Sequence, residues 1–471
     1  MLDFTHLEQY RENNRIEAKK ALGGLPRSIW ETYSAFANTM GGVILLGVEE
    51  YKDRTLHPVN LPDPERLVRE FWDKVNNPAI TNINILSPKN IQIRNINGND
   101  IIVITVPRAT RQERPVYINK SPLNGSYRRN GEGDYKCTRE EVLGMQRDAL
   151  IIAPDMKHLP HLSLDVFHFE TVHRYRNRLK SYSPGHPWEG LTDADFLCEL
   201  DAVELGEDNQ MHPTAAGLLM FGLESAITRE FPNYHLEFKW AEGQFSSGSD
   251  DLSDNLCDFY FRVCDYFAKH LATLPAGIKP GTMPYIHEAL REALSNCLIN
   301  ADYYGSCGIS ISLLDNCFCF RNPGSFRINV EDAKYGGISD PRNGTLVKMF
   351  NILDIGDSSG DGLSRIYDIW QQMGWDFPII RETFAPDTIE LTLKMHHNDG
   401  HKLSGSTGSF ATSQSNRRLI ISYLTKHAQA TEEELTDFIG LTASDVRELL
   451  TDLIELGIIE IKAPAVYRLK A

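Results

Sequence analysis

A segment that cannot pack into a core divides this chain near its C-terminal end. Residues 397–416 are HNDGHKLSGSTGSFATSQSN, in which Gly, Ser and Thr dominate. Such a composition is typical of a flexible linker, because it offers few apolar side chains to bury. We therefore expect a linker over 397–415 and a separate unit over 416–471. A weaker break near 153–160 divides the rest into one unit over 1–152 and another over 155–396.

The composition is that of an ordinary globular protein with an acidic balance. The 471 residues contain 48 Lys and Arg against 64 Asp and Glu, a net charge of −16, and 41% are hydrophobic. This balance excludes a polybasic protein, although one basic face can still bind nucleic acid. No stretch reaches the roughly 18 apolar residues that span a bilayer, and the first residues do not resemble a secretory signal. Eight cysteines are too sparse for a disulfide framework. We expect a cytoplasmic protein without membrane contact.

Acidic residues flank the first apolar strand of the chain, predicted over 43–48 (VILLGV). Glu12 and Glu17 precede it, and Glu50 follows it closely. Lys19 lies two residues after Glu17, so the two side chains share one face of a strand. Carboxylates that converge at strand ends can bind a divalent cation for phosphodiester cleavage. The alternative is a set of solvated surface carboxylates with a local lysine partner.

The stretch 107–139 is locally basic. It contains eight Lys and Arg against three Asp and Glu, a local net charge of +5, and three interleaved tyrosines. Cations neutralise phosphates and aromatic rings stack on bases, so the stretch is a candidate nucleic-acid surface. The alternative is a solvated loop face with structural tyrosines. The candidate contacts are Arg108, Arg111, Arg114, Lys120, Arg128 and Arg129.

Three motifs of the first unit resemble the Schlafen/Alba-type domain: residues 14–19 (NRIEAK), 33–50 (YSAFANTMGGVILLGVEE) and 127–131 (YRRNG). The resemblance implies a nucleic-acid-binding domain over about the first 150 residues. Some members are endoribonucleases that act on tRNA through three acidic residues, and by position these are Glu12, Glu17 and Glu50. The third is commonly Asp in the nuclease members, and the Glu found here moves its carboxylate by about one methylene. For a nuclease, the resemblance implies Mg²⁺ or Mn²⁺ at these three residues, with Lys19 beside them.

A polar stripe marks the helix predicted from residue 286 onward. Glu288, Glu292, Asn296 and Asn300 recur every four residues, so they share one helix face. An exposed face more often contains Lys, Glu and Gln than two Asn, and we therefore interpret the stripe as a site. A Glu can orient a water molecule, and an Asn can ligate Mg²⁺ beside phosphates. The alternative is the exposed face of an amphipathic helix.

This helix and the segments after it resemble the RecG-like C-terminal module, a divergent GHKL-type ATP-binding domain. The resemblance covers 155–396, with its specific motifs at 291–303 (REALSNCLINADY), 322–324 (NPG) and 360–366 (GDGLSRI). It implies that Glu292 orients water and that Asn296 holds Mg²⁺ with ATP. Asn322 stands where ordinary GHKL proteins have an adenine-binding Asp, and it accepts a hydrogen bond without the charge. Glycines before a helix can place backbone N–H groups against phosphate. The implied nucleotide site is Glu292, Asn296, Asn300, Asn322, Gly324, Gly360 and Gly362.

The last unit has the order of a winged helix-turn-helix. Helices are predicted over 417–426, 431–439 and 443–456, and strands over 458–461 and 467–469. The helix that would enter DNA contains four acidic residues and one Arg, so phosphates would repel it. We therefore expect this unit to dock a protein partner or a second copy of the chain. A homodimer fits both resembled families.

Together these features predict an α/β (α+β) chain: a mixed-sheet Schlafen/Alba-like domain, a GHKL-like α/β sandwich and a winged helix. The first hypothesis is a nucleic-acid-binding protein that acts as a metal-dependent nuclease of RNA, tRNA or single-stranded DNA under control of its ATP-binding domain. A role in bacterial phage defence follows by analogy alone. The second hypothesis is a non-catalytic, ATP-dependent transcriptional regulator that binds DNA. The third is an assembly module whose acidic clusters are surface.

Overall fold

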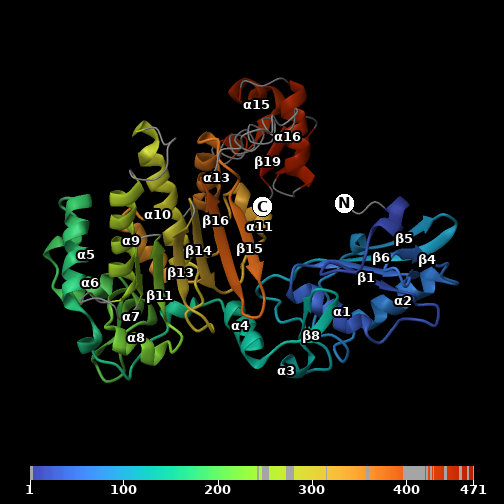
Figure 1. The fold of residues 1–471 in the computed structure, drawn as a ribbon, viewed down its shortest axis with the longest axis horizontal. Helices are drawn as coiled ribbons and strands as arrows, with labels where there is room; N and C mark the ends of the chain where they lie inside the picture. Colours follow the sequence, from blue (N-terminus) through green and yellow to red (C-terminus); the bar gives the residue numbers. More distant parts are fainter. Residues whose placement is uncertain are drawn as a thin grey trace.

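Two α/β units make up most of this computed structural model, as Figure 1 shows. The structure describes residues 4–240, 243–246, 254–271, 280–314, 316–356 and 360–395. Of the last unit it describes residues 420, 423–424, 427, 429–439, 443–455, 459–463 and 466–469. The predicted linker over 397–415 and most of the helix predicted over 417–426 lie outside the described residues.

A four-stranded sheet forms the centre of the first unit, in the order β1-β2-β6-β5. β1 pairs parallel with β2, and the other neighbours are antiparallel. In β6, Ile102 and Ile104 belong to the core beneath helices α1 and α2, whereas Ile101 and Val103 belong to a cluster on the other face. The near-continuous apolar run of β6 is therefore explained by burial on both faces. The elements are η1 (Phe4–Gln9), β1 (Ile16–Lys19), α1 (Ile29–Asn38), β2 (Gly42–Leu46), β3 (Val48–Glu50), β4 (Leu56–Pro58), α2 (Pro64–Val75), η2 (Pro88–Asn90), β5 (Ile91–Ile96), β6 (Asn99–Val106), α3 (Pro122–Gly125), β7 (Tyr127–Asn130), β8 (Gly133–Lys136) and α4 (Arg139–Ala149).

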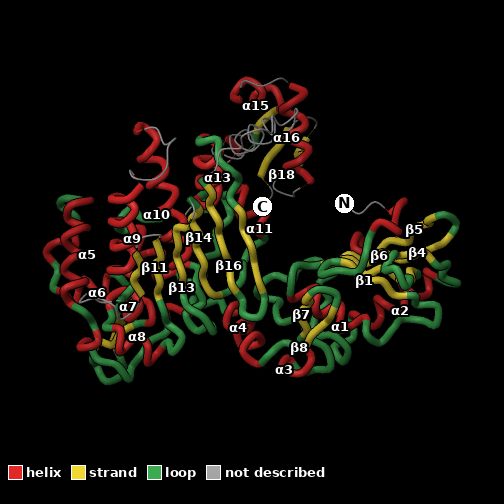
Figure 2. The backbone as a smooth tube through the Cα atoms, in the orientation of Figure 1, coloured by secondary structure: helices red, strands yellow, loops and turns green. Residues whose placement is uncertain are grey.

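A six-stranded sheet forms the second unit. Helices lie against this sheet, as Figure 2 shows. Its order is β12-β11-β13-β14-β16-β15, and only β11 and β13 are parallel among its described neighbours. Leu294 and Leu298 of helix α10 share one core with Phe318 and Phe320 of β14, so the apolar side of α10 faces the sheet. The elements after α4 are η3 (Pro154–Met156), η4 (Leu164–Val166), α5 (Phe169–Tyr182), η5 (Pro187–Gly190), α6 (Asp193–Glu199), β9 (Val203–Leu205), β10 (Met211–Pro213), α7 (Ala215–Phe221), α8 (Glu224–Glu230), β11 (Leu236–Trp240), β12 (Gly243–Ser246), α9 (Leu256–His270), η7 (Pro280–Thr282), α10 (Met283–Ile299), β13 (Ile309–Leu314), β14 (Cys317–Pro323), α11 (Val330–Tyr335), α12 (Gly344–Asn351), α13 (Gly362–Gln372), β15 (Ile379–Thr383) and β16 (Thr388–Lys394).

The described elements of the last unit are two helices and a three-stranded sheet in the order β17-β19-β18. Leu435, Leu450 and Ile459 belong to its buried core. Its described elements are β17 (Ala430–Thr431), α15 (Glu432–Ile439), α16 (Ala443–Glu455), β18 (Ile459–Ala463) and β19 (Val466–Leu469). The predicted α+β class of the whole chain is confirmed. Among the described residues, no helix combines the length and the apolar character that a bilayer span requires.

Candidate acidic centre and nucleotide pocket

Glu17 is the buried member of the acidic residues predicted from the sequence. It lies in β1, opposite Ile44 of β2, and is 9% exposed. Its Oε1 atom lies 2.8 Å from Lys19 Nζ, and its Oε2 atom lies 2.8 Å from Arg129 Nη2. The alternation of a strand places Glu17 and Lys19 on one face, as the sequence indicated. Two cations therefore already occupy both oxygens of this carboxylate.

Glu12 lies close enough to Glu17 and to Glu50 to interact with both of their charges. Glu12 Oε1 accepts a hydrogen bond of 2.8 Å from the N–H of Ala18. Burial raises the pKa of Glu12, and the neighbouring charges of Glu17 and Glu50 raise it further against the opposing effect of Arg129. Glu50 ends β3 and is exposed. The structure thus brings Glu12, Glu17, Lys19 and Glu50 into one electrostatic neighbourhood.

The donors of this acidic centre do not fit the predicted Mg²⁺ or Mn²⁺ site at Glu12, Glu17 and Glu50. A divalent cation needs free carboxylate oxygens, and those of Glu17 are taken by Lys19 and Arg129. Among the residues that the structure describes, no group of three or more His, Cys, Asp and Glu side chains could hold a metal ion. The expected metal ligands are corrected accordingly: Lys19 and Arg129 supply the positive charge there.

Four of the predicted nucleic-acid contacts bind the second unit instead of facing solvent. Arg108 forms a bidentate ion pair with Glu382, in which Nη1 lies 2.5 Å from Oε2 and Nη2 lies 2.8 Å from Oε1. Arg111 Nε lies 2.5 Å from Asp340 Oδ2. Arg128 pairs with Asp387, and Arg114 Nη2 donates to the carbonyl of Phe326 at 3.3 Å. Three carboxylates more than two hundred residues away therefore neutralise part of the local charge of +5, which the sequence stretch alone could not show.

The other two predicted contacts have different surroundings. Arg129 is 3% exposed and belongs to the acidic centre, where it pairs with Glu17 and Asp134 and donates to the carbonyl of Asn13. Lys120 lies in a loop and is exposed. Of the six predicted residues, Lys120 alone has the exposure that a contact on the surface of this conformation requires.

A pocket in the second unit brings together most of the predicted nucleotide residues. Asn296 and Asn300 of α10, Asn322 of β14, and Gly360 and Gly362 before and at the start of α13 all line it. Glu292 lies one helical turn from Asn296 and accepts a 3.0 Å hydrogen bond from Asn296 Nδ2. Gly324 lies just after Asn322, against the guanidinium group of Arg342.

The polar stripe of α10 passes from solvent into this pocket. Glu288 is exposed and pairs with Arg365 at 3.2 Å, whereas Glu292 is 7% exposed. A Cβ atom at Gly362 would lie 1.8 Å from Glu292 Oε1, so the start of α13 rests directly on the carboxylate. A negative charge at a helix N-terminus is favourable. From Glu292 onward, the stripe is thus packed against the pocket and is not the exposed face of an amphipathic helix.

Sequence reasoning missed the loop that closes the other side of the pocket. The pocket lining includes Arg327, Asp340 and Arg342, and Arg342 is 3% exposed. Arg342 donates from Nε to the carbonyl of Asn300 at 3.1 Å and from Nη2 to the carbonyl of Ser325 at 2.9 Å, and it also pairs with Asp148. The polar, Pro- and Gly-bounded run 340–344 (DPRNG) before α12 was the available signal.

Comparisons with known proteins agree with the resemblances found in the sequence. Residues 12–138 match the family model "Schlafen, AlbA_2", and residues 307–393 match "Putative ATP-dependent DNA helicase recG C-terminal". Residues 144–237, which span the boundary predicted near 153, match a domain of unknown function, DUF8451. The predicted resemblance to the Schlafen/AlbA and RecG-like families is confirmed.

Two solved structures are similar to this chain. The DIP2311 protein from Corynebacterium diphtheriae is 17% identical, with a TM-score of 0.40, over 97% of this chain and 80% of that one. The N-terminal domain of a RecG-related protein from Nitrosomonas europaea is 33% identical, with a TM-score of 0.24, over 30% of this chain and 96% of that one. The curated proteins give no match. Two parts of the chain are thus similar to a nucleic-acid-related family and to an ATP-binding family. Homodimerisation, partner docking by the last unit and a defence role stay predictions.

Proposed function

We propose that this chain binds nucleic acid through its first unit and that nucleotide binding in its second unit controls this binding. The supporting observation is that two residues that line the pocket also contact arginines of the first unit. The carbonyl of Phe326 accepts hydrogen bonds from Arg108 and Arg114, and Asp340 pairs with Arg111. A ligand in the pocket therefore touches the residues that hold the first unit.

The chemistry of the pocket suits a nucleoside triphosphate with Mg²⁺. Asn296 offers the amide oxygen that would hold the metal with ATP, and the start of α13 offers backbone N–H groups for phosphate. Arg327 adds a cation whose Nε atom has no hydrogen-bond partner within the described residues. Bound Mg²⁺ would neutralise charge on the phosphates. Because Glu292 is engaged by Asn296, we propose binding rather than rapid hydrolysis.

The nucleotide proposal is tested by calorimetric titration of Mg·ATP into Asn296→Ala. We expect the affinity to fall at least tenfold, because the amide that would hold the metal is removed. Glu288→Ala is the matched control, since Glu288 lies on the same face of α10 but is exposed. Equal titrations of wild type and Asn296→Ala would contradict the nucleotide site.

The nucleic-acid proposal is tested with labelled single-stranded RNA, tRNA and duplex DNA at two salt concentrations, with and without Mg·ATP. Fluorescence anisotropy should show binding that weakens steeply with salt, because phosphate contacts release counterions. It should also show an affinity that changes when Mg·ATP is added. No binding to any of the three probes at low salt would contradict the proposal.

Phosphodiester cleavage is a second candidate function, favoured by the proximity of Glu12, Glu17 and Glu50. A carboxyl group with a raised pKa, as at Glu12, can hold a proton for a leaving oxygen, and Lys19 and Arg129 can stabilise negative charge. Incubation with tRNA and single-stranded RNA, in Mn²⁺ or EDTA, tests this candidate directly.

Three substitutions locate the activity if cleavage occurs. Glu17→Gln and Glu50→Gln should both abolish cleavage, and Glu50→Gln should do so without loss of stability because Glu50 is exposed. Glu49→Gln is the control, since Glu49 forms an exposed pair with Lys20. Unchanged cleavage in Glu17→Gln and Glu50→Gln would remove the proposed centre.

A further inference from the structure

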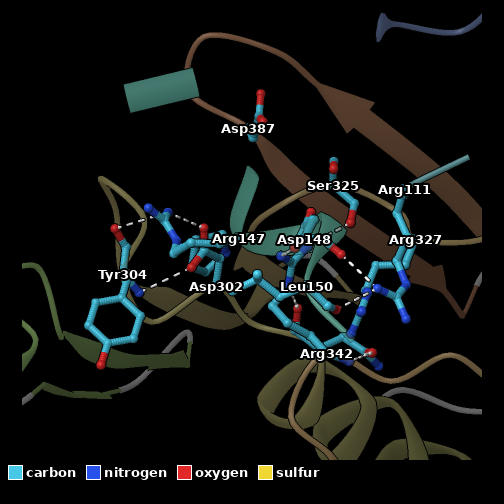
Figure 3. Close-up of polar contacts among 12 residues, drawn as sticks. Arg111, Arg147, Asp148, Leu150, Asp302, Tyr304, Ser325, Arg327, Arg342 and Asp387 are labelled. Atoms are coloured by element: carbon cyan, nitrogen blue, oxygen red, sulfur yellow. Dashed lines mark hydrogen bonds and ion pairs between the residues drawn. The ribbon is translucent and has the colours of Figure 1, made fainter. Parts of the chain in front are cut away.

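Five arginines of the first unit meet the second unit on one surface, which we call the arginine face: Arg108, Arg111, Arg114, Arg128 and Arg147. Four of these arginines form ion pairs with carboxylates of the second unit. Arg108 meets Glu382, Arg111 meets Asp340, Arg128 meets Asp387, and Arg147 Nη2 lies 2.9 Å from Asp302. Figure 3 shows the contacts of Arg111 and Arg147 with the residues around them.

The geometry of these pairs is also the geometry of phosphate recognition. Arg108 and Arg128 each present two nitrogen atoms to one carboxylate, Arg108 to Glu382 and Arg128 to Asp387. A guanidinium group binds carboxylate and phosphate through the same bidentate pair of hydrogen bonds. The carboxylates of the second unit can therefore stand in for the phosphates of a polyanion.

The arginine face has more donors than its protein partners accept. Arg114 is 3% exposed, and its Nε and Nη1 atoms have no hydrogen-bond partner among the described residues. The same holds for Nε of Arg128 and of Arg147. Burial lowers the pKa of Arg114 to about 10; the charges of Arg108 and Arg128 lower it too, whereas those of Asp148 and Glu382 raise it. The two donor atoms of Arg114 that lack a hydrogen bond could bind a further acceptor, such as a phosphate oxygen.

We propose that the arginine face is a binding surface for a nucleic-acid backbone, which Glu382, Asp387, Asp340 and Asp302 cover in the closed conformation described here. When the units separate, the five arginines become available together, and Nε and Nη1 of Arg114 become available to a phosphate. This inference rests on the proposed function, because it concerns where the nucleic acid binds and what excludes it.

The test compares nucleic-acid affinity in the full chain after removal of two covering charges. In the double variant Glu382→Gln with Asp387→Asn, we expect the affinity for single-stranded RNA without nucleotide to rise at least tenfold. The dependence on salt should also steepen, because more phosphates are neutralised. The matched control is Glu204→Gln with Glu207→Gln, which removes the same charge from two exposed positions of the second unit. An unchanged affinity in the double variant, or an equal rise in the control, would overturn the inference.

A second variant keeps the test decisive if the double variant does not fold. Arg114→Met leaves every ion pair of the arginine face in place and should lower the affinity of the full chain for RNA at least threefold. Arg94→Met is its control, since Arg94 is exposed on β5 and bonds Gln92. An affinity of Arg114→Met equal to that of wild type would count against the surface.

If wild type binds RNA and none of these variants alters binding, the surface is wrong while the proposed function stands. If wild type binds no nucleic acid, the proposed function itself fails.

Discussion

Two adjacent arginines on β7 show how a single sequence run serves two sites. Successive side chains of a strand point in opposite directions. Arg128 therefore reaches Asp387 in the second unit, whereas Arg129 reaches Glu17 in the acidic centre. The stretch 107–139 predicted one basic surface because its charges are close in sequence. At the scale of residues, the strand therefore separates these charges onto its two faces.

The substitution Arg129→Ala tests the positioning role of this arginine. It removes one partner of the buried Glu17, along with hydrogen bonds to the carbonyls of Asn13 and Ile16. Breaking a buried ion pair from one side costs about 3–5 kcal/mol, and we expect a lower midpoint of thermal unfolding. In the control Arg54→Ala, an exposed pair with Glu132 is lost, which costs at most about 1 kcal/mol. Equal midpoints for the two variants would show that Arg129 is not required to hold Glu17.

Asp155 predicts a pH dependence of stability. Burial raises the pKa of Asp155 from 3.8 to about 6, although the N–H of Leu346 donates to the carboxylate at 2.9 Å. The folded state therefore holds its proton more tightly than the unfolded state does. The free energy of unfolding should fall as pH rises from about 4 to about 6 and should lose up to about 3 kcal/mol from this group. Denaturant unfolding of Asp155→Asn across this range should show a flatter profile; an identical slope in wild type and variant would contradict the assignment.

At the scale of elements, the sequence predicted the helices and strands that depend on residues close together in the chain. The strand over 43–48 was located by a short apolar run and the helix that contains Glu292 by its polar stripe, and the structure has β2 and α10 there. The partners of these elements were not predictable in this way. Asp340 and Arg342 lie in a loop without periodicity, and the pair of Arg108 with Glu382 joins residues 274 apart.

The contact between α13 and α10 supplies a test at this scale. Gly362 starts α13 so close to Glu292 that any Cβ must displace the carboxylate. Gly362→Ala should therefore weaken Mg·ATP binding at least tenfold. Gly344→Ala is a matched control at the start of α12, where the nearest atom to a new Cβ is 3.9 Å away, and alanine there should stabilise the helix by up to about 1 kcal/mol. Calorimetry and thermal unfolding of both variants measure the difference, and unaltered nucleotide affinity in Gly362→Ala would show that this contact does not shape the pocket.

At the scale of the whole molecule, Asp340 connects the pocket with the arginine face, because it lines the pocket and pairs with Arg111. Binding at two coupled sites must be reciprocal: if Mg·ATP changes the affinity for RNA by a given factor, RNA must change the affinity for Mg·ATP by the same factor. We expect a factor of about 5 to 150, the range of ordinary coupling.

Asp340→Asn breaks the pair with Arg111 while leaving Asn296 and Gly362 in place, so it should bring this factor close to one. Anisotropy titrations with RNA at zero and saturating Mg·ATP, and calorimetric titrations with Mg·ATP at zero and saturating RNA, measure the two factors independently. Coupling that survives unchanged in Asp340→Asn would mean that the two units communicate through other contacts, such as the pair of Asp148 with Arg342.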